Sequence, residues 1–340
     1  WVNQIQGWSG GGGRTSLLFD DAVPSKAPVD IPQSRAFRGV GWAGLHGNLA
    51  DVDNDTFFLF KSSPYGSVSH SHADQNCFAI MKGGKALAIP SGYYGPSYGM
   101  AHHAEWTRST KANNGILVNG EGQEIRSARA NGRLVNFEER KGLSYVCGDA
   151  KAAYVGKLNH FDRHVLFLRP GLILMLDDLV APEVSHFQWM LHAFDEMELG
   201  EGQVISRRAD KTLDVRLSSP HGLKLSQTDE FDTPFNAGIP ESFHKEMPNH
   251  WHVTAETQKK AEATRIGAVL GVFDQAESFE IEELDHDGWF GAKAMGDFGV
   301  VEGWVQLVDG AGGPDGFGDL VRGGSVKVCG RASDGDVFVI

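Results

Sequence analysis

Short apolar runs separated by turn residues are the dominant pattern along this chain of 340 residues. Residues 78–89 form two such runs around the turn Lys82-Gly83-Gly84-Lys85, and Asn119-Gly120 ends another run with a strong hairpin signal. Further runs lie at 56–60, 164–168, 172–176, 187–192, 213–217, 250–254 and 266–273. Long apolar stripes at the helical repeat are absent, and only the short stretch 258–263 has a helical pattern. The pattern predicts an all-β fold, a large antiparallel β-sandwich of two sheets.

The first part of the chain differs from the rest. A flexible Ser9-Gly10-Gly11-Gly12-Gly13 stretch is followed by Pro24, Pro28 and Pro32. We therefore predict that 1–34 is a linker, a residual segment from a preceding domain, and that 35–340 is one β-sheet domain. Because the chain begins at Trp1, with no signal peptide, we expect it to be processed, excerpted or incomplete.

Composition excludes some classes of function. The formal net charge is -13, which argues against a nucleic-acid binder. No stretch approaches the roughly 20 apolar residues of a membrane span. The three cysteines, Cys77, Cys147 and Cys329, show no paired spacing, so they predict neither a disulfide framework nor a thiolate zinc site.

The most chemically informative stretch runs from Ser69 to Asn76. It places two imidazoles, His70 and His72, next to Asp74 and two amides, directly before an apolar run. Such a cluster is costly to desolvate unless it is used or satisfied. Three interpretations compete: a metal site, an acid/base and substrate site, or structural histidines held by hydrogen bonds.

The metal interpretation is the weaker of the first two. The spacing matches the beginning of the HxHxDH motif of metallo-β-lactamase-like hydrolases, but Gln75 stands where that motif requires its last histidine. That fold also alternates strands with helices, which this pattern does not. A metal-dependent hydrolase remains the less favoured alternative.

An ordered series of motifs surrounds this stretch. It comprises Lys61-Ser62-Ser63-Pro64-Tyr65-Gly66, Ser91-Gly92-Tyr93-Tyr94-Gly95, His102-His103-Ala104-Glu105-Trp106-Thr107-Arg108, Thr110-Lys111-Ala112-Asn113-Asn114, Ile116–Gln123, Arg163-His164-Val165-Leu166-Phe167 and Asp177-Asp178-Leu179. Together they resemble the heparinase II/III-like superfamily of polysaccharide lyases, and most closely the branch with exolytic alginate and heparin lyases. The resemblance covers 35–193 and continues more weakly to the C-terminus.

The resemblance implies an architecture. Members of this superfamily have an N-terminal (α/α) toroid followed by a stacked antiparallel β-sheet domain, and this chain matches the β-sheet domain. A toroid is thus expected on the N-terminal side, outside this chain, and it would supply a Tyr and a His or Asn to a shared site. Periplasmic or secreted localisation is also implied by the resemblance.

The implied chemistry is β-elimination on an anionic polysaccharide that contains uronic acid, such as alginate or a heparin-like glycosaminoglycan. The C5 proton becomes removable once the adjacent carboxylate is neutralised, and His or Tyr can then transfer protons. By resemblance, His70 is the candidate catalytic residue. The candidate substrate-binding residues are Tyr93, Tyr94, His103, Trp106, Arg108 and Lys111. The structural alternatives are core positions for the aromatic rings and an ion pair between Arg108 and Glu105.

No cofactor is expected to be required. Many relatives hold a structural zinc through the second His of the HxH motif, an Asp and a later His. His72 matches the first of these positions, but Pro90 and Asn113 occupy the other two. Proline offers no ligand atom and asparagine is a poor zinc ligand, so a structural divalent metal at this position is doubtful. We expect His72 to orient a neighbour instead.

A polysaccharide lyase, or its β-sheet domain, is therefore the favoured function. A carbohydrate-binding β-sandwich without catalytic activity is the main alternative, because part of the shared site would lie outside this chain.

Overall fold

The structure is a computed structural model that describes residues 26–94, 98–277, 279–286, 289–306 and 327–339. The chain divides into two compact units, Trp1–Ile31 and Pro32–Ile340, and every described strand belongs to the second unit. Most of the predicted linker thus lies outside the described residues. Within the described part, no helix is long and apolar enough to cross a membrane.

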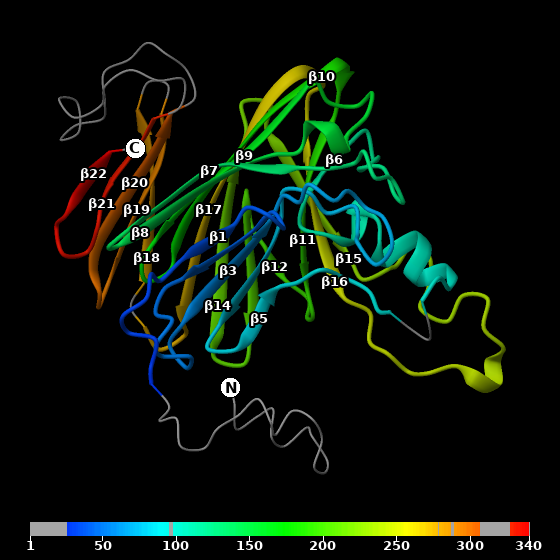
Figure 1. Ribbon diagram of the computed structural model, residues 1–340, viewed down its shortest axis with the longest axis horizontal. Helices are drawn as coiled ribbons and strands as arrows, with labels where there is room; N and C mark the ends of the chain where they lie inside the picture. Colours follow the sequence, from blue (N-terminus) through cyan, green and yellow to red (C-terminus); the bar gives the residue numbers. More distant parts are fainter. Residues whose placement is uncertain (1–25, 95–97, 278, 287–288, 307–326, 340) are drawn as a thin grey trace. The chain divides into compact units, whose positions relative to one another are not determined.

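The described strands form four antiparallel sheets, where the sequence predicted two (Figure 1). The first sheet contains β1 (Arg35–Phe37), β2 (Trp42–His46), β3 (Thr56–Lys61), β4 (Cys77–Lys82) and β5 (Lys85–Ala88). The second has the order β12 (Glu198–Leu199), β13 (Gln203–Arg208), β14 (Lys211–Ser218), β17 (Ala261–Asp274), β10 (Leu172–Ser185), β9 (His160–Leu168), β8 (Leu143–Asp149) and β7 (Arg133–Arg140).

Two smaller sheets complete the unit. One has the order β15 (Leu223–Thr228), β16 (Trp251–Thr257), β11 (Phe187–Ala193) and β6 (Ile116–Val118). The other contains β18 (Phe279–His286), β19 (Trp289–Gly296), β20 (Gly299–Gln306), β21 (Lys327–Arg331) and β22 (Val337–Val339). The all-β, antiparallel class predicted from the sequence is confirmed.

The eight-stranded sheet is buried on both faces in its central strands. Along β9, Val165 and Phe167 join a core shared with the β1–β5 sheet and the β6–β11–β16–β15 sheet. The alternating residues Leu166 and Leu168 join a second core with the C-terminal sheet, coloured orange to red in Figure 1. A strand buried on both faces explains the continuous apolar run that the sequence shows here.

The local predictions differ in outcome. The runs at 164–168 and 172–176 form the antiparallel neighbours β9 and β10, joined by the turn after Leu168. Asn119 and Gly120 adopt left-handed backbone (φ of 51° and 81°), but only the single bridge Val118–Glu121 follows, and β6 pairs with β11 instead. The helix predicted at 258–263 is wrong, since β17 begins at Ala261. Its alternating residues pair with β10, and this tertiary pairing outweighs the local pattern.

One buried ion pair in the eight-stranded sheet also contacts two loop segments, at Asn76 before β4 and at Asn114 before β6. Arg163 on β9 and Asp177 on β10 lie directly opposite each other, and both side chains are fully buried. The guanidinium donates to both carboxylate oxygens, at 2.6 and 2.8 Å. It also donates to the backbone carbonyls of Asn76 and Asn114, at 2.7 and 3.1 Å. All of these groups are satisfied by one side chain, so its loss would leave several buried polar groups unpaired.

We therefore predict that Asp177→Ala lowers the free energy of unfolding by about 3–5 kcal/mol, because it leaves a buried guanidinium uncompensated. Urea unfolding followed by circular dichroism measures this. The matched control is Glu198→Ala, which removes an exposed partner of Arg207 and should cost about 1 kcal/mol or less. Equal effects of the two substitutions would contradict a special role for the buried pair.

Two buried histidines are associated with the pair of strands β11 and β16: His192 lies on β11, and His250 directly precedes β16. Burial, helped by the nearby His252, lowers the pKa of His192 on β11 to about 3. Burial, with a repulsive contribution from His102, lowers the pKa of His250 to about 4. In the unfolded chain both imidazoles titrate near the ordinary value of about 6.5. The unfolded state thus binds more protons than the folded state between these values.

Stability should therefore fall as the pH is lowered through about 6.5 towards 4, by about 1.4 kcal/mol per pH unit for each of these histidines. The measurement is the urea midpoint and slope at a series of pH values. Whatever the stability of His192→Gln at pH 7, the pH dependence of its stability should be shallower by the contribution of one histidine. An unchanged slope in that variant would contradict the assignment.

Candidate active site

The loop that carries His70 is fixed by buried amides at both ends. Gln75 accepts from the Ser63 backbone N–H through Oε1 at 2.6 Å. Gln123 pairs with the backbone of Gln75 in both directions, with both hydrogen bonds at 2.8 Å. These amides are the satisfied structural residues of the polar cluster. His70 itself is exposed and follows Ser69, which has left-handed backbone (φ of 53°).

Arg108 also holds this loop in place, through hydrogen bonds to its backbone. Its side chain is buried, and Nη2 donates to the carbonyls of Ser67 and Ser71, at 2.8 and 3.3 Å. These two carbonyls lie on either side of His70 in the sequence. The predicted pairing with Glu105 is not present, since Glu105 accepts from Thr233 instead. In this structure Arg108 positions the His70 loop, and its charge acts on the site at short range.

His70 lies in an aromatic cluster that includes two exposed tyrosines. Its Nδ1 is hydrogen-bonded to the hydroxyl of Tyr94. The ring of Tyr98 lies 4.4 Å from the His70 ring, centroid to centroid, and its hydroxyl donates to the Ser69 carbonyl at 2.7 Å. His103 packs against both tyrosines, with ring centroids 4.5 Å from Tyr94 and 4.9 Å from Tyr98. Three of these four residues were predicted from the sequence.

His103 presents an unused hydrogen-bond donor within this cluster. Its Nδ1 accepts from the Gly99 backbone N–H at 3.1 Å, so the proton of the neutral imidazole is on Nε2. Nε2 is buried and has no partner among the described residues. Burial lowers the pKa of His103, and the positive charges of His72, Arg108, His70 and Arg126 lower it further. The two arginines near this neutral imidazole favour an anionic ligand at the neighbouring surface.

The remaining predicted aromatics form a separate cluster. Trp106, on the π-turn η2 (His102–Thr107), is buried against Phe231 at 5.2 Å between ring centroids. Tyr93 donates its hydroxyl to the Pro248 carbonyl and packs on Phe235 at 5.2 Å. This cluster supports η2, which carries His103. The structure thus brings Tyr94 and His103 to His70 but does not bring Tyr93 or Trp106 into contact with it.

Lys111 also lies apart from His70. It is on the short 3-10 turn η3 (Thr110–Ala112), and its Nζ forms an exposed ion pair with Asp232 at 2.7 Å. Its role in substrate binding stays a prediction.

The three positions of the expected metal site do lie together. His72, Pro90 and Asn113 line one cavity of about 150 Å³. Asn113 uses its amide to donate to the Ser109 carbonyl at 2.7 Å. The same cavity is lined by Lys61 and Asp74, which form an ion pair. With one imidazole and a neighbouring ammonium, these residues do not fit a zinc ion.

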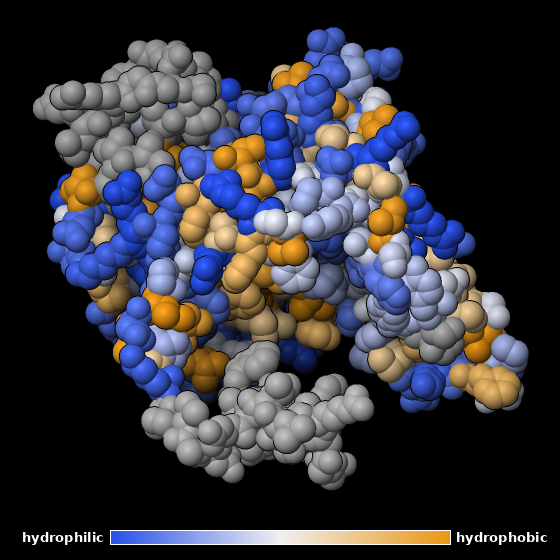
Figure 2. All heavy atoms as spheres, viewed as in Figure 1, coloured by the Kyte–Doolittle hydropathy of each residue, from blue (hydrophilic) through white to orange (hydrophobic). Residues whose placement is uncertain are grey.

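Sequence reasoning missed Tyr98 and Arg126. Tyr98 is an aromatic residue in a glycine-rich loop just before the His102-His103 pair, which is the signal that could have identified it. Arg126 is exposed and has left-handed backbone (φ of 59°), which the sequence does not indicate. Figure 2 shows that the surface around η2 is mostly polar or weakly polar rather than one apolar patch.

Comparisons with known proteins agree with this fold. Structures of the heparan sulfate lyase HepC from Pedobacter heparinus and of a protein described as heparinase III match with TM-scores of 0.61 and 0.58. Sequence identities are 17% and 13%, over 82% and 79% of this chain. In each case the match covers 42% of the other chain, so this chain spans less than half of those proteins.

The family comparison is more direct than the structural one. The model described as "Heparinase II/III-like, C-terminal" matches residues 31–269, which is more than half of the chain. The resemblance seen in the sequence is therefore confirmed. The chain belongs to the heparinase II/III-like family and contains its C-terminal β-sheet domain.

Proposed function

We propose that this domain contributes His70 and Tyr94 to a lyase site that cleaves a uronate-containing polysaccharide by β-elimination. The observation that carries the proposal is the hydrogen bond between His70 Nδ1 and the Tyr94 hydroxyl, on an exposed loop that Arg108 holds through two backbone carbonyls. Each side chain in this pair can accept or donate a proton. The pair is accessible, in contrast to the buried histidines of the fold.

The reaction requires the carboxylate of the uronate to be neutralised first. The exposed guanidinium of Arg126 is suited to donate to this carboxylate, and the buried charge of Arg108 adds to the attraction. The buried Nε2–H of His103 would reach the carboxylate only after a neighbouring side chain moves. Neutralisation stabilises the negative charge that develops when the C5 proton leaves. Tyr98 borders the same space and offers an aromatic face to a sugar ring.

Proton transfer then proceeds through the exposed pair. In our proposal, His70 donates its Nδ1–H to the Tyr94 oxygen, which leaves Nε2 free to accept the C5 proton. The electrons of the C5–H bond form the C4–C5 double bond, the C4–O bond breaks, and a second acid protonates the leaving oxygen. By family resemblance, that acid comes from a toroid domain.

The substrate class follows from the same charges. A carboxylate-bearing polymer is favoured over a neutral glycan, because the groups around His103 are cationic although the whole chain has a net charge of -13. The names of the structural neighbours suggest heparan sulfate, and the sequence resemblance also includes alginate. Both belong in the assay.

We predict that His70→Ala in the protein at its full natural length reduces turnover by about 100- to 10,000-fold, the usual contribution of a positioned acid or base. Tyr94→Phe should reduce it by about tenfold, since it removes one hydrogen bond that orients the imidazole. The ultraviolet absorbance of the unsaturated uronate product measures turnover on heparan sulfate, heparin and alginate. Tyr65→Phe, at an exposed tyrosine of a neighbouring loop, is the matched control and should be neutral.

The outcomes separate the alternatives. Full activity of His70→Ala would refute the proposed role of His70. If the wild-type protein binds a uronan in calorimetry but produces no absorbance change, the domain belongs to a carbohydrate-binding protein without lyase activity. Cleavage of a uronan that releases reducing ends without any unsaturated product, and that stops on addition of a chelator, would instead favour a metal-dependent hydrolase.

A further inference from the structure

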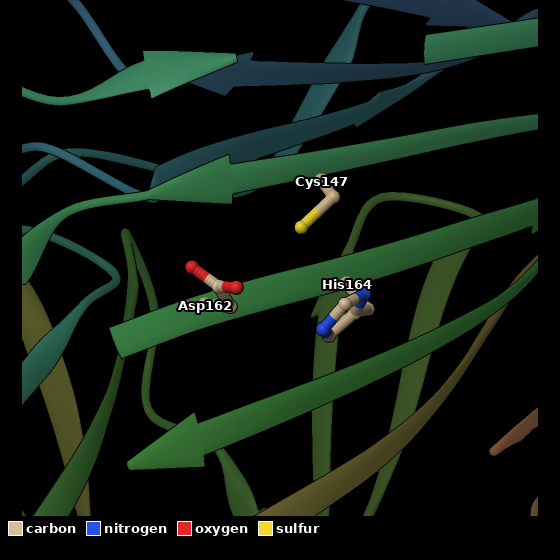
Figure 3. A group of neighbouring side chains, drawn as sticks. All are labelled: Cys147, Asp162 and His164. Carbon is tan, nitrogen blue, oxygen red and sulfur yellow. The ribbon is translucent and has the colours of Figure 1, made fainter. Parts of the chain in front are cut away.

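A second group of polar side chains lies on the eight-stranded sheet, away from the His70 loop. Cys147 comes from β8, and Asp162 and His164 come from β9 (Figure 3). One ligand atom from each residue lies within 4.8 Å of the other two. Cys147 and His164 are buried, and Asp162 is partly exposed.

Strand geometry accounts for this convergence. Cys147 and His164 are directly opposite each other in the antiparallel register, and Asp162 is two residues before His164. Residues two apart on a strand share a face, so all three side chains project from the same side of the sheet. Arg163, between Asp162 and His164, points to the other side, where it contacts Asn76 and Asn114. The group therefore lies on the opposite face from the loops of the candidate active site.

The Tyr145 hydroxyl is hydrogen-bonded to the Cys147 sulfur, whereas Asp162 and His164 each keep a donor atom without a hydrogen bond from the described residues. The Nδ1 of His164 is hydrogen-bonded to the Tyr145 hydroxyl at 2.7 Å, which orients the ring and leaves Nε2 without a hydrogen bond from the described residues. Asp162 likewise accepts no hydrogen bond within the described part of the chain, and its nearest cationic group is His160, 3.9 Å away. Metal-bound histidines typically make such a hydrogen bond through the ring nitrogen that does not bind the metal, which here is Nδ1.

A row of carboxylates gives an independent indication of a cation. In the register of β8, β9 and β10, Asp149, Asp162 and Asp178 lie directly opposite one another. Like charges at such positions destabilise a sheet unless they are compensated. Arg133 compensates Asp149 at 2.9 Å, and Arg265 compensates Asp178 at 3.3 Å. The middle carboxylate, Asp162, has no arginine partner among the described residues, and His160 lies 3.9 Å from it but closer, at 3.3 Å, to Asp178.

We propose that Cys147, Asp162 and His164 bind a divalent transition-metal ion, with Zn²⁺ as the favoured ion. A thiolate and an imidazole select against Mg²⁺ and Ca²⁺, and the mixed sulfur, nitrogen and oxygen set suits zinc. One thiolate and one carboxylate balance the charge of a divalent ion. Three protein ligands leave the fourth tetrahedral position for water, on the partly exposed side at Asp162.

Binding requires two adjustments. Zinc bonds are about 2.0–2.3 Å long, so the three donor atoms must move closer together than the 4.8 Å within which they now lie. The partly exposed side chain of Asp162 is free to rotate for this. The thiol must also release its proton, so metal affinity should decrease as the pH is lowered. The bound ion would connect β8 to β9 and so stabilise the sheet.

The test is titration of the chelator-treated protein, at its full natural length, with Co²⁺ followed by Zn²⁺. We expect one equivalent of Co²⁺ to produce a sulfur-to-cobalt charge-transfer band together with the visible bands of a four-coordinate ion, and Zn²⁺ to displace it. Zn²⁺ should also raise the melting temperature. Asp162→Asn, a conservative change at a partly exposed position, should weaken binding at least tenfold, and Cys147→Ser should abolish the charge-transfer band.

Two matched controls assign the signal to this site. Cys77→Ser removes another buried cysteine, and His72→Ala removes the histidine of the expected family metal position; both should retain the band. Absence of the band in the wild-type protein would overturn the proposal, as would its persistence in Cys147→Ser. Unchanged affinity in Asp162→Asn would overturn the assigned ligand set, even if Cys147→Ser failed to fold. Lyase activity is not part of this test, so its outcome is independent of the proposed function.

Discussion

The buried guanidinium of Arg163 is the interaction on which the arrangement of this domain depends most. It pairs with Asp177 within the eight-stranded sheet and donates to the carbonyls of Asn76 and Asn114. Asn76 ends the loop of His70, and Asn114 follows the segment that contains η2 and η3. A charge buried this completely is tolerated only when its hydrogen bonds are satisfied. The two segments that form the candidate site are thus held at fixed positions relative to one sheet.

The site itself is built on this support in layers. Gln75 and Gln123 fix the ends of the His70 loop, and Arg108 holds its middle through two backbone carbonyls. On top of this buried support, the side chains of His70, Tyr94 and Tyr98 are exposed to solvent. Side chains that act on a substrate gain precision when their own backbone is fixed by buried hydrogen bonds. This explains why so many polar residues of the motif are buried and do not face a ligand.

The sequence was a good guide to strands and a poorer guide to contacts. Continuous apolar runs, such as the one at 165–168, predicted strands such as β9, because a strand buried on both faces has apolar residues at successive positions. The partner of β6 could not be predicted, since its pairing with β11 spans about 70 residues and depends on the tertiary fold. For the same reason the motif singled out His70, Tyr94 and His103, which lie in one cluster, but it did not predict that Lys111 pairs with Asp232 or that Trp106 packs on Phe231. The effect of Arg126 on His103 depends on the folded arrangement, which composition does not reveal.

The need to compensate buried carboxylates explains the difference between two positions in this fold, the cavity lined by His72 and the group that contains Asp162. At the cavity with His72, the carboxylate of Asp74 is compensated by the ammonium of Lys61, so no further cation is required there. On the face of the eight-stranded sheet, Arg133 and Arg265 compensate the outer carboxylates, but Asp162 between them has no such partner. Because a partly buried carboxylate with weak compensation is costly, Lys61 offsets the negative charge at the first position, whereas at the second the nearest cationic group is His160, 3.9 Å from Asp162. Sequence reasoning treated the cysteines only by their mutual spacing, and it therefore could not suggest the proposed site, in which Cys147 would be the single sulfur ligand.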